Sequence, residues 1–310
     1  MEGLIVADET TQTEKPKSPD AWTVMRLLGW TTDFFRKRGS ESPRLDAEVL
    51  LAHAKDCSRI ALYTAFDTEP TNEQREAFRE MVRRRGDGAP VAYLVGYREF
   101  YSLRMRVNES VLIPRPETEH VVIEALDQAK TMLAAEPARS LRIVDVGTGS
   151  GSIAIAIAKH LPSALVTAID LSSDALQIAK WNVEQHAVVD RVTLVQGDLL
   201  APVPADGSSD IIVSNPPYVT EAEYAQLAPT VREHEPRGAL VAGPAGTEII
   251  ERLVMDAASR LRSGGHLIIE FSPMIADASA KILRNTGFYE EPKFIKDLAG
   301  HRRLISARRL

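Results

Sequence analysis

The fold is decided by the stretch Leu141-Arg142-Ile143-Val144-Asp145-Val146-Gly147-Thr148-Gly149-Ser150-Gly151. Its first six residues form a mostly apolar run of strand length, and the run from Ser152 to Lys159 that follows the glycines has the pattern of a helix. Glycines between a strand and a helix permit a tight turn and let a ligand approach the backbone at the helix N-terminus. The stretch therefore predicts a ligand-binding loop inside an α/β domain.

The spacing of these glycines indicates which ligand the loop takes. A dinucleotide fingerprint needs its third glycine at position 152, which is a serine here. The observed pattern, G-x-G-x-G, resembles the nucleotide loop of class I methyltransferases. Asp170 ends the next predicted strand, where a carboxylate accepts hydrogen bonds from both ribose hydroxyls. Asp198, in Gly197-Asp198-Leu199, is placed where such enzymes commonly contact adenine, although an ordinary turn aspartate is the alternative.

The C-terminal half alternates between strand-like and helix-like segments. Strands are predicted at 141–146, 164–169, 191–196, 209–214 and 265–271, with further strand-like runs at 287–295 and 301–308. This alternation predicts an α/β fold with a mainly parallel, seven-stranded, Rossmann-like sheet and helices on both faces. Ligands bind such sheets at the carboxyl ends of the strands, so the informative loops follow the strands.

The fourth predicted strand runs directly into Asn215-Pro216-Pro217-Tyr218. Prolines fix φ and cannot continue a sheet ladder, so this segment is predicted to be a rigid loop. An amide nitrogen is a poor nucleophile, and its methylation needs hydrogen-bond acceptors rather than a strong base. The Asn215 side-chain oxygen and the Pro216 carbonyl are the predicted acceptors, and Tyr218 is predicted to pack on the flat acceptor group. Proximity and orientation then supply most of the acceleration.

The tetrapeptide leaves the substrate open. It is shared by amino methyltransferases of DNA adenine and cytosine, by rRNA base methyltransferases and by protein glutamine methyltransferases. A base-modifying enzyme must flip its target and hold phosphates with basic residues. The chain has 37 basic and 43 acidic residues, and the resulting net charge of -6 disfavours a nucleic-acid partner. A surface turn, or a binding module without activity, is the remaining alternative, but the glycine loop and the tetrapeptide are both intact.

The N-terminal third has helical periodicity and is predicted to form a small bundle. We expect a disordered tail over 1–19, a helical substrate-docking domain over 20–88, a β-hairpin linker over 89–115 and the methyltransferase domain over 116–310. In the linker, the alternation of Leu103, Met105 and Val107 predicts one strand, a turn at Asn108-Glu109, and a second strand through residues 111–113. A helix is predicted over 117–135.

Four further segments carry a more specific resemblance. They are Ser42-Pro43-Arg44-Leu45-Asp46-Ala47-Glu48, Pro90-Val91-Ala92-Tyr93-Leu94-Val95-Gly96, Val111-Leu112-Ile113-Pro114-Arg115-Pro116-Glu117-Thr118-Glu119 and Glu235-Pro236-Arg237-Gly238-Ala239-Leu240. Together they closely resemble the bacterial peptide chain release factor glutamine N5-methyltransferases, the HemK/PrmC family. The resemblance implies transfer of a methyl group from S-adenosylmethionine, leaving S-adenosylhomocysteine, to the glutamine of the Gly-Gly-Gln motif in release factors.

The resemblance also implies roles for individual residues. It implies that S-adenosylmethionine is contacted by Gly147, Thr148, Gly149, Ser150, Gly151, Asp170, Leu199 and Asn215, and that the substrate glutamine is held by Asn215, Pro216, Pro217 and Tyr218. Arg115, Glu117 and Glu119 are candidates for a lid, in the region where the related ribosomal-protein glutamine methyltransferases differ. The chain departs from the family's Glu-Ile-Gly-x-x-Gln pattern at Glu270-Phe271-Ser272-Pro273-Met274-Ile275, and Leu199 replaces what is often an aromatic residue.

The remaining expectations concern surroundings and partners. The first 20 residues resemble neither a signal peptide nor a membrane span, and no apolar run approaches the roughly 20 residues that a spanning helix requires. We therefore expect a cytoplasmic monomer with release factors as protein substrates, and with no metal, nucleic-acid or membrane partner.

Overall fold

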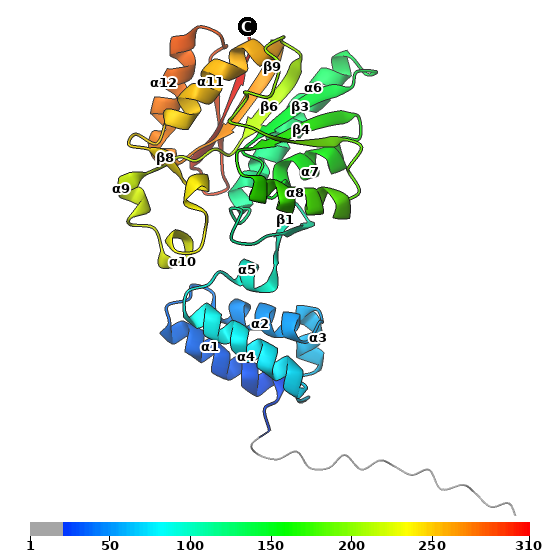
Figure 1. Cartoon of the computed structure of the whole chain (residues 1–310), viewed down its shortest axis with the longest axis vertical. Helices are drawn as coiled ribbons and strands as arrows, with labels where there is room; N and C mark the ends of the chain where they lie inside the picture. The colour runs from blue at the N-terminus through cyan, green and yellow to red at the C-terminus, as the bar shows by residue number, and fades with distance from the viewer. Residues whose placement is uncertain (1–20) are drawn as a thin grey trace, which may run out of the picture. The chain divides into compact units, whose positions relative to one another are not determined.

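The computed structural model describes residues 21–310 and divides into two compact units, one ending at Asp87 and the other running from Gly88 to Leu310 (Figure 1). The expectation for residues 1–19 lies outside the described residues. Within residues 21–310, no helix combines the length and the apolar character needed to cross a bilayer.

The first unit consists of four helices, as the sequence predicts. They are α1 (Val24–Lys37), α2 (Pro43–Ala54), α3 (Arg59–Thr64) and α4 (Asn72–Gly86). Helix α4 begins at a reciprocal capping box, in which Thr71 and Gln74 each bond the other's backbone N–H. The helices bury one apolar stripe each, and the resulting core contains Leu28, Phe35, Leu50, Leu51 and Leu62.

The second unit begins with α5 (Val91–Val95) and an antiparallel hairpin of β1 (Tyr97–Phe100) and β2 (Leu103–Arg106). The turn lies at Tyr101-Ser102, both at positive φ (50° and 61°), as a two-residue turn of the favoured hand requires. A turn does lie at the predicted Asn108-Glu109, because the Val111 amide donates to the Asn108 carbonyl at 3.1 Å. No strand follows it at residues 111–113, so the predicted second strand there is wrong. Val107 and Val111 are buried because they pack against a helix of the catalytic unit, so their alternation reflects burial rather than strand pairing.

A seven-stranded sheet forms the centre of this unit, confirming the predicted fold. Its strands are β3 (Leu141–Val146), β4 (Ala164–Asp170), β5 (Val192–Gln196), β6 (Ser209–Ser214), β9 (Leu261–Glu270), β10 (Lys293–Lys296) and β11 (Arg302–Arg308). The order is β10-β11-β9-β6-β3-β4-β5, parallel from β9 to β5 and antiparallel where β11 joins β9 and β10.

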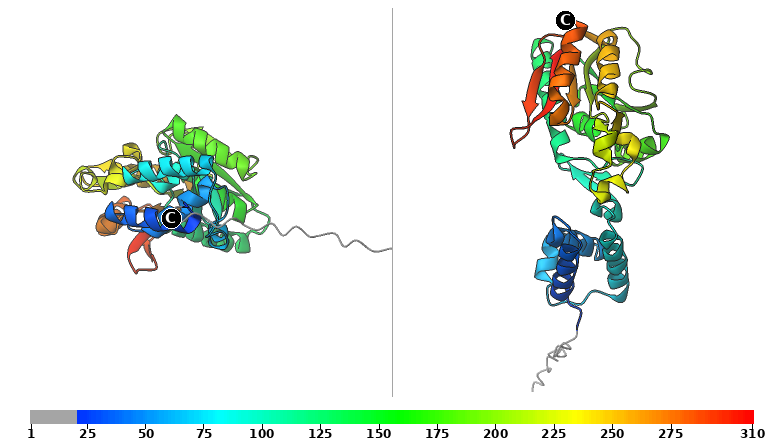
Figure 2. Two further views of the ribbon diagram at one scale, coloured as in Figure 1. Left: turned by 90° about the horizontal axis from the view of Figure 1, so that it is seen from below. Right: turned by 90° about the vertical axis from the view of Figure 1, so that its left-hand side faces the viewer.

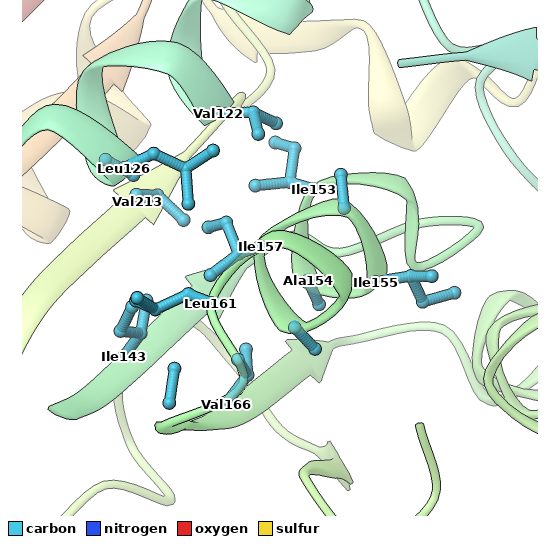
Figure 3. Packing of buried hydrophobic residues seen from close by; sticks show 14 of the residues in the cluster. Val122, Leu126, Ile143, Ile153, Ala154, Ile155, Ile157, Leu161, Val166 and Val213 are labelled. Carbon is cyan, nitrogen blue, oxygen red and sulfur yellow. The ribbon is translucent and has the colours of Figure 1, made fainter. Parts of the chain in front are cut away.

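Helices cover both faces of the sheet because successive strand residues point to opposite sides. Ile143 belongs to a core with α6 (Glu119–Ala135) and α7 (Ser152–His160), as Figure 3 shows. Its neighbour Val144 belongs to a second core, with α11 (Glu248–Arg260) and α12 (Ala276–Thr286). Helix α8 (Ser173–Gln185) completes the first side.

The segment between β6 and α11 was not predicted as regular structure. It contains β7 (Val219–Thr220), α9 (Glu221–Tyr224), α10 (Pro229–Arg232), the 3-10 turn η2 (Arg237–Ala239) and β8 (Val241–Gly243). This segment, yellow in Figure 2, extends beyond the end of the sheet. Two further 3-10 turns, η1 (Pro116–Thr118) and η3 (Pro273–Ile275), precede α6 and α12. All these pieces are short and border the carboxyl ends of the strands.

Candidate active site

The order of the strands creates the crevice in which the site lies. The chain passes from β3 to β4 on one side and later returns to β6 on the other, so strand order reverses at β3. Open α/β sheets bind ligands at the carboxyl ends of the strands beside such a reversal. Val146 and Ser214, the last residues of β3 and β6, are register partners, and the Ser214 hydroxyl donates to the Val146 carbonyl at 2.7 Å. The glycine loop and the tetrapeptide therefore start side by side.

The glycine loop has the open backbone that a close ligand needs. Gly147, Gly149 and Gly151 all have positive φ (72°, 55° and 82°), a conformation that side chains disfavour. The loop is fixed to β4, because the amides of Gly147 and Thr148 both donate to the Ile169 carbonyl at 2.9 Å. A Cβ built on Gly149 would meet no atom within 4 Å. The backbone there faces open space, which fits a cofactor in contact with it.

Asp145 holds the glycine loop through hydrogen bonds, and the sequence did not predict this role. Its Oδ2 accepts hydrogen bonds from the Thr148 hydroxyl at 2.6 Å and from the Ala154 amide at 3.2 Å. The side chain is fully buried, and burial raises its pKa to about 7. The only sequence signal was an acidic residue near the end of an otherwise apolar strand. Asp145 thus joins the loop to the first turn of α7.

Asp170 lies at the end of β4, beside the loop. Its Oδ2 accepts from the Gly149 amide at 2.8 Å, and its Oδ1 accepts from the Ser172 amide at 2.9 Å. Each carboxylate oxygen has a second lone pair. The carboxylate is therefore held by backbone donors and keeps the capacity to accept two hydroxyl groups, as expected for a ribose-binding residue.

Asp198 and Leu199, the expected adenine contacts, follow β5. Asp198 pairs with Arg252 at 2.5 Å, and about half of each side chain is exposed (51% and 53%). Leu199 has a positive φ of 49°, uncommon for a residue with a side chain, and packs half-buried against the core that includes α11. The structure thus places Asp198 in a surface ion pair and Leu199 at the rim of that core.

The tetrapeptide presents its groups next to the glycine loop. The Asn215 Nδ2 donates to the Thr118 hydroxyl at 3.1 Å, and no donor in residues 21–310 bonds to its Oδ1. Tyr218 is partly buried against the core on the α11 side, and this burial raises the pKa of its phenol. A cavity of about 330 Å³ adjoins Tyr218, and it is lined also by Val219, Glu223, Gln226, Leu227 and Ser272.

The three lid candidates separate into different roles. Arg115 donates to the Glu235 carboxylate at 2.6 Å, and this nearly buried carboxylate also accepts from the Ile113 amide at 3.2 Å. The pair ties the residue 113–115 segment to the segment between α10 and η2. Glu119 instead accepts from the Tyr101 amide at 2.9 Å and so supports the hairpin turn. Glu117 lies close enough to influence both Tyr218 and Glu270 electrostatically.

The strand end at Glu270 borders the same crevice. Glu270 is the last residue of β9, and burial raises its pKa to about 7. In the atypical segment that follows, Phe271 is fully buried and packs edge-on against Phe294 at 6.2 Å between ring centroids. Ser272 caps η3 and lines the cavity beside Tyr218. The departure from the family pattern thus fills the core and forms part of the pocket wall.

Comparisons with known proteins agree with this geometry. The family model described as PrmC N-terminal domain matches residues 26–96, and the one described as Methyltransferase small domain matches residues 122–232. A release factor glutamine methyltransferase of Rhodopirellula baltica is 63% identical over 92% of this chain and 96% of its own. The chain belongs to the release factor glutamine methyltransferase family. A member from Chlorobaculum tepidum is 44% identical over 84% of this chain and 88% of its own.

A solved structure with lower sequence identity shares the fold of this chain. The catalytic domain of hMettl16 in complex with MAT2A 3'UTR hairpin 6 superposes with a TM-score of 0.54 at 18% identity, covering 74% of this chain and 82% of that one. At this identity the likeness concerns the fold alone. It agrees with the seven-stranded sheet of the second unit.

Proposed function

We propose that this protein transfers a methyl group from S-adenosylmethionine to the side-chain amide nitrogen of the glutamine in the Gly-Gly-Gln motif of peptide chain release factors. The observation that carries the proposal is the juxtaposition of the glycine loop and Asn215-Pro216-Pro217-Tyr218 at the ends of paired strands, in a chain 63% identical to a release factor glutamine methyltransferase. S-adenosylmethionine supplies an electrophilic methyl group on a sulfonium.

The residues that fit the cofactor lie around the carboxyl ends of β3 and β4. The open backbone at Gly147 and Gly149 would accommodate it, and the braced carboxylate of Asp170 would accept its ribose hydroxyls. Leu199 and Asp198 follow β5, on the side where adenine is expected. Because the Arg252 ion pair already engages Asp198, we propose that Leu199 provides the larger part of the adenine contact.

The tetrapeptide would orient the acceptor. A glutamine amide nitrogen has its lone pair delocalised, and it becomes reactive toward methyl transfer when both N–H bonds are held and the lone pair is aimed. The Asn215 Oδ1, which no donor in the described chain engages, and the Pro216 carbonyl are the acceptors for those two N–H bonds. Tyr218, itself buried on one side, would pack on the planar amide. Fixed acceptors of this kind lower the barrier through positioning. The amide nitrogen gives up one of its two protons to solvent when it gains the methyl group.

The protein substrate is favoured over a nucleic acid by charge. The chain carries a net charge of -6, and the cavity beside Tyr218 contains Glu223 but no lysine or arginine. A phosphate backbone held near this site would need cationic groups to replace its counterions. A loop of a protein has no such requirement.

We further propose that the helical unit docks the release factor. A specific protein complex typically buries about 1,200–2,000 Å² in total, far more than a loop tip in a pocket provides. The helical unit carries a cavity of about 600 Å³ lined by Trp22, Trp30 and Phe34 together with charged residues of α4. Trp30 stacks on Phe34 with 5.3 Å between ring centroids, yet 53% of it remains exposed. Exposed aromatic residues around a hollow are typical of protein-binding surfaces.

The test is methylation of a purified release factor. The protein is incubated with release factor and S-adenosylmethionine carrying a labelled methyl group, and the labelled residue is located by peptide mass mapping. The proposal expects one methyl group on the side chain of the glutamine in Gly-Gly-Gln. Faster methylation of rRNA, duplex DNA or a ribosomal protein would overturn it.

A further inference from the structure

Three side chains from separate elements lie close together at the start of the tetrapeptide. Asn215 follows β6, Thr118 ends η1, and Glu270 ends β9, the strand paired with β6. Asn215 Nδ2 lies 3.1 Å from the Thr118 hydroxyl. That hydroxyl is close enough to the Glu270 carboxyl group to lower its pKa, and the buried Glu270 Oε2 has no other hydrogen-bond partner in residues 21–310. Thr118 and Glu270 are 3% and 2% exposed, so water has little access to the space between them. None of the expected site residues included Thr118 or Glu270.

The donors and acceptors in this chain have only one arrangement when Glu270 is ionised. A carboxylate only accepts, so the single hydroxyl hydrogen of Thr118 points to Glu270. The Thr118 oxygen must then accept from Asn215, which requires the amide NH2 of Asn215 on that side. The Asn215 Oδ1 consequently lies on the other side of the carboxamide, away from Thr118. A polar chain of this kind fixes an amide orientation that packing alone leaves open.

We propose that Thr118 and Glu270 are positioning residues that hold the Asn215 carboxamide with its Oδ1 toward the substrate amide. The inference rests on the proposed function, since it concerns how the acceptor in that reaction is aimed. It assigns no contact between substrate and either Thr118 or Glu270. Their effect passes through Asn215.

Protonation of Glu270 removes this constraint. A neutral carboxyl group donates its own hydrogen to the Thr118 oxygen, which frees the Thr118 hydrogen to point at Asn215. A flipped Asn215, with Oδ1 toward Thr118 and NH2 toward the substrate, then satisfies the chain equally well. In that orientation the Asn215 NH2 faces the NH2 of the substrate glutamine, and two hydrogen-bond donors oppose each other. Protonated Glu270 therefore permits an unproductive amide orientation.

The surroundings of Glu270 put this change near neutral pH. Burial raises its pKa to about 7 against the opposing effect of the Thr118 hydrogen bond. Among the charges nearby, Glu117 raises the pKa further, whereas Arg303 and Arg115 lower it. The phenol of Tyr218 also faces Glu270 and is neutral in this range, because its own pKa is raised by burial. Turnover is thus expected to fall as the pH drops through about 7.

Variants of Thr118 separate positioning from mere packing. Thr118→Val keeps the shape but removes the hydroxyl, and we expect kcat to fall roughly tenfold, as for a misaimed group. The KM for release factor and the Kd for S-adenosylmethionine should change by less than about twofold, since neither ligand touches Thr118. Thr118→Ser restores the hydroxyl and should recover most of kcat. Equal loss in the serine and valine variants, or unchanged kcat in the valine variant, would contradict the proposal.

Glu270→Gln provides the matching pH experiment. The glutamine side chain cannot titrate, and its NH2 can donate to the Thr118 oxygen as the neutral carboxyl group does. The acid limb of kcat near pH 7 in the wild type should be absent from the Gln variant, whose kcat at pH 8 should already be as low as that of the wild type at acid pH. An unaltered acid limb in Glu270→Gln would assign that limb to another group and overturn the role of Glu270.

A readout without catalysis keeps this inference separate from the proposed function. The side-chain NH2 signals of Asn215, assigned by their loss in Asn215→Ala, can be followed by nitrogen-15 NMR from about pH 5.5 to 8.5. They should shift with a midpoint near 7 in the wild type and lose that shift in Thr118→Val. Asn215 NH2 signals that do not shift with pH, or that shift alike in both proteins, would contradict the inference. That result holds whether or not release factor is the substrate.

Discussion

Replacing Asp170 with alanine is expected to weaken binding of S-adenosylmethionine. The substitution removes the acceptor at the end of β4 that is already held by the amides of Gly149 and Ser172, at 2.8 and 2.9 Å. Two effects add: the ribose loses charge-assisted hydrogen bonds, and the glycine loop loses its tie to β4 at Gly149. We expect Kd to rise roughly ten- to a hundredfold, about 1.4–3 kcal/mol.

Isothermal titration calorimetry with the cofactor alone measures this change without any protein substrate. Asp170→Asn is the finer variant, because its amide oxygen still accepts from Gly149 while the charge is lost, and its Kd should lie between the other two. Asp174→Ala is the matched control: it removes a carboxylate from an exposed position in the first turn of α8. Kd in that control should change by less than about threefold.

The outcomes separate clearly. Unchanged affinity in Asp170→Ala would remove Asp170 from the cofactor site. Equal losses in Asp170→Ala and Asp174→Ala would show that the net charge near the crevice matters rather than the hydrogen bonds. A loss in Asp170→Ala accompanied by a fall in unfolding temperature larger than that of Asp170→Asn would instead point to damage of the glycine loop.

Three further predictions test the acceptor and the helical unit. Asn215→Ala should keep the Kd for S-adenosylmethionine within about tenfold yet lower kcat at least about a hundredfold, and near-normal turnover in a stopped assay would refute its role. A chain beginning at Pro90 should still bind the cofactor by calorimetry, but should lose activity on intact release factor far more than on a short Gly-Gly-Gln peptide; equal losses would mean that the helices act on folding or cofactor binding instead. Trp30→Ala should raise the KM for release factor roughly tenfold, as for an aromatic hot spot, whereas Ile60→Ala, which removes a side chain 78% exposed on α3, should not; similar KM values for both variants would place the docking surface elsewhere.

The sequence predicted the sheet well because buried strands leave a strong local signal. The strands β3 and β6 begin and end at the predicted residues, 141–146 and 209–214, because each contains a short apolar run bounded by polar or turn residues. The hairpin turn was misplaced because a strand-like alternation at Val107 and Val111 came from packing against α8. Only the backbone pairing of β1 with β2 separates these two causes of alternation.

The residues of the candidate site that form local sequence patterns were predicted, and those without such a pattern were missed. Glycine spacing and the tetrapeptide are local patterns, so the sequence was enough to single out the loop and Asn215. The supporting residues were missed for two reasons. Asp145 acts locally, on Thr148 and the Ala154 amide, through side-chain hydrogen bonds that a residue pattern does not reveal. Thr118 and Glu270 act through contacts between elements far apart in the chain. Thr118 and Asn215, for example, are 97 positions apart. The only available signal was an acidic residue at or near the end of a buried strand, as at Asp145 and Glu270.

Methylation of the Gly-Gly-Gln glutamine is tested by locating the methyl group that the protein transfers. Purified release factor, S-adenosylmethionine with a labelled methyl group and the full chain are combined, and the digested release factor is mapped by mass spectrometry with fragmentation of the Gly-Gly-Gln peptide. We expect a single added methyl group on the glutamine side-chain amide, formed at least about a hundredfold more slowly by Asn215→Ala. A methyl group on any other residue of release factor, or label found only on added rRNA or DNA, would contradict it.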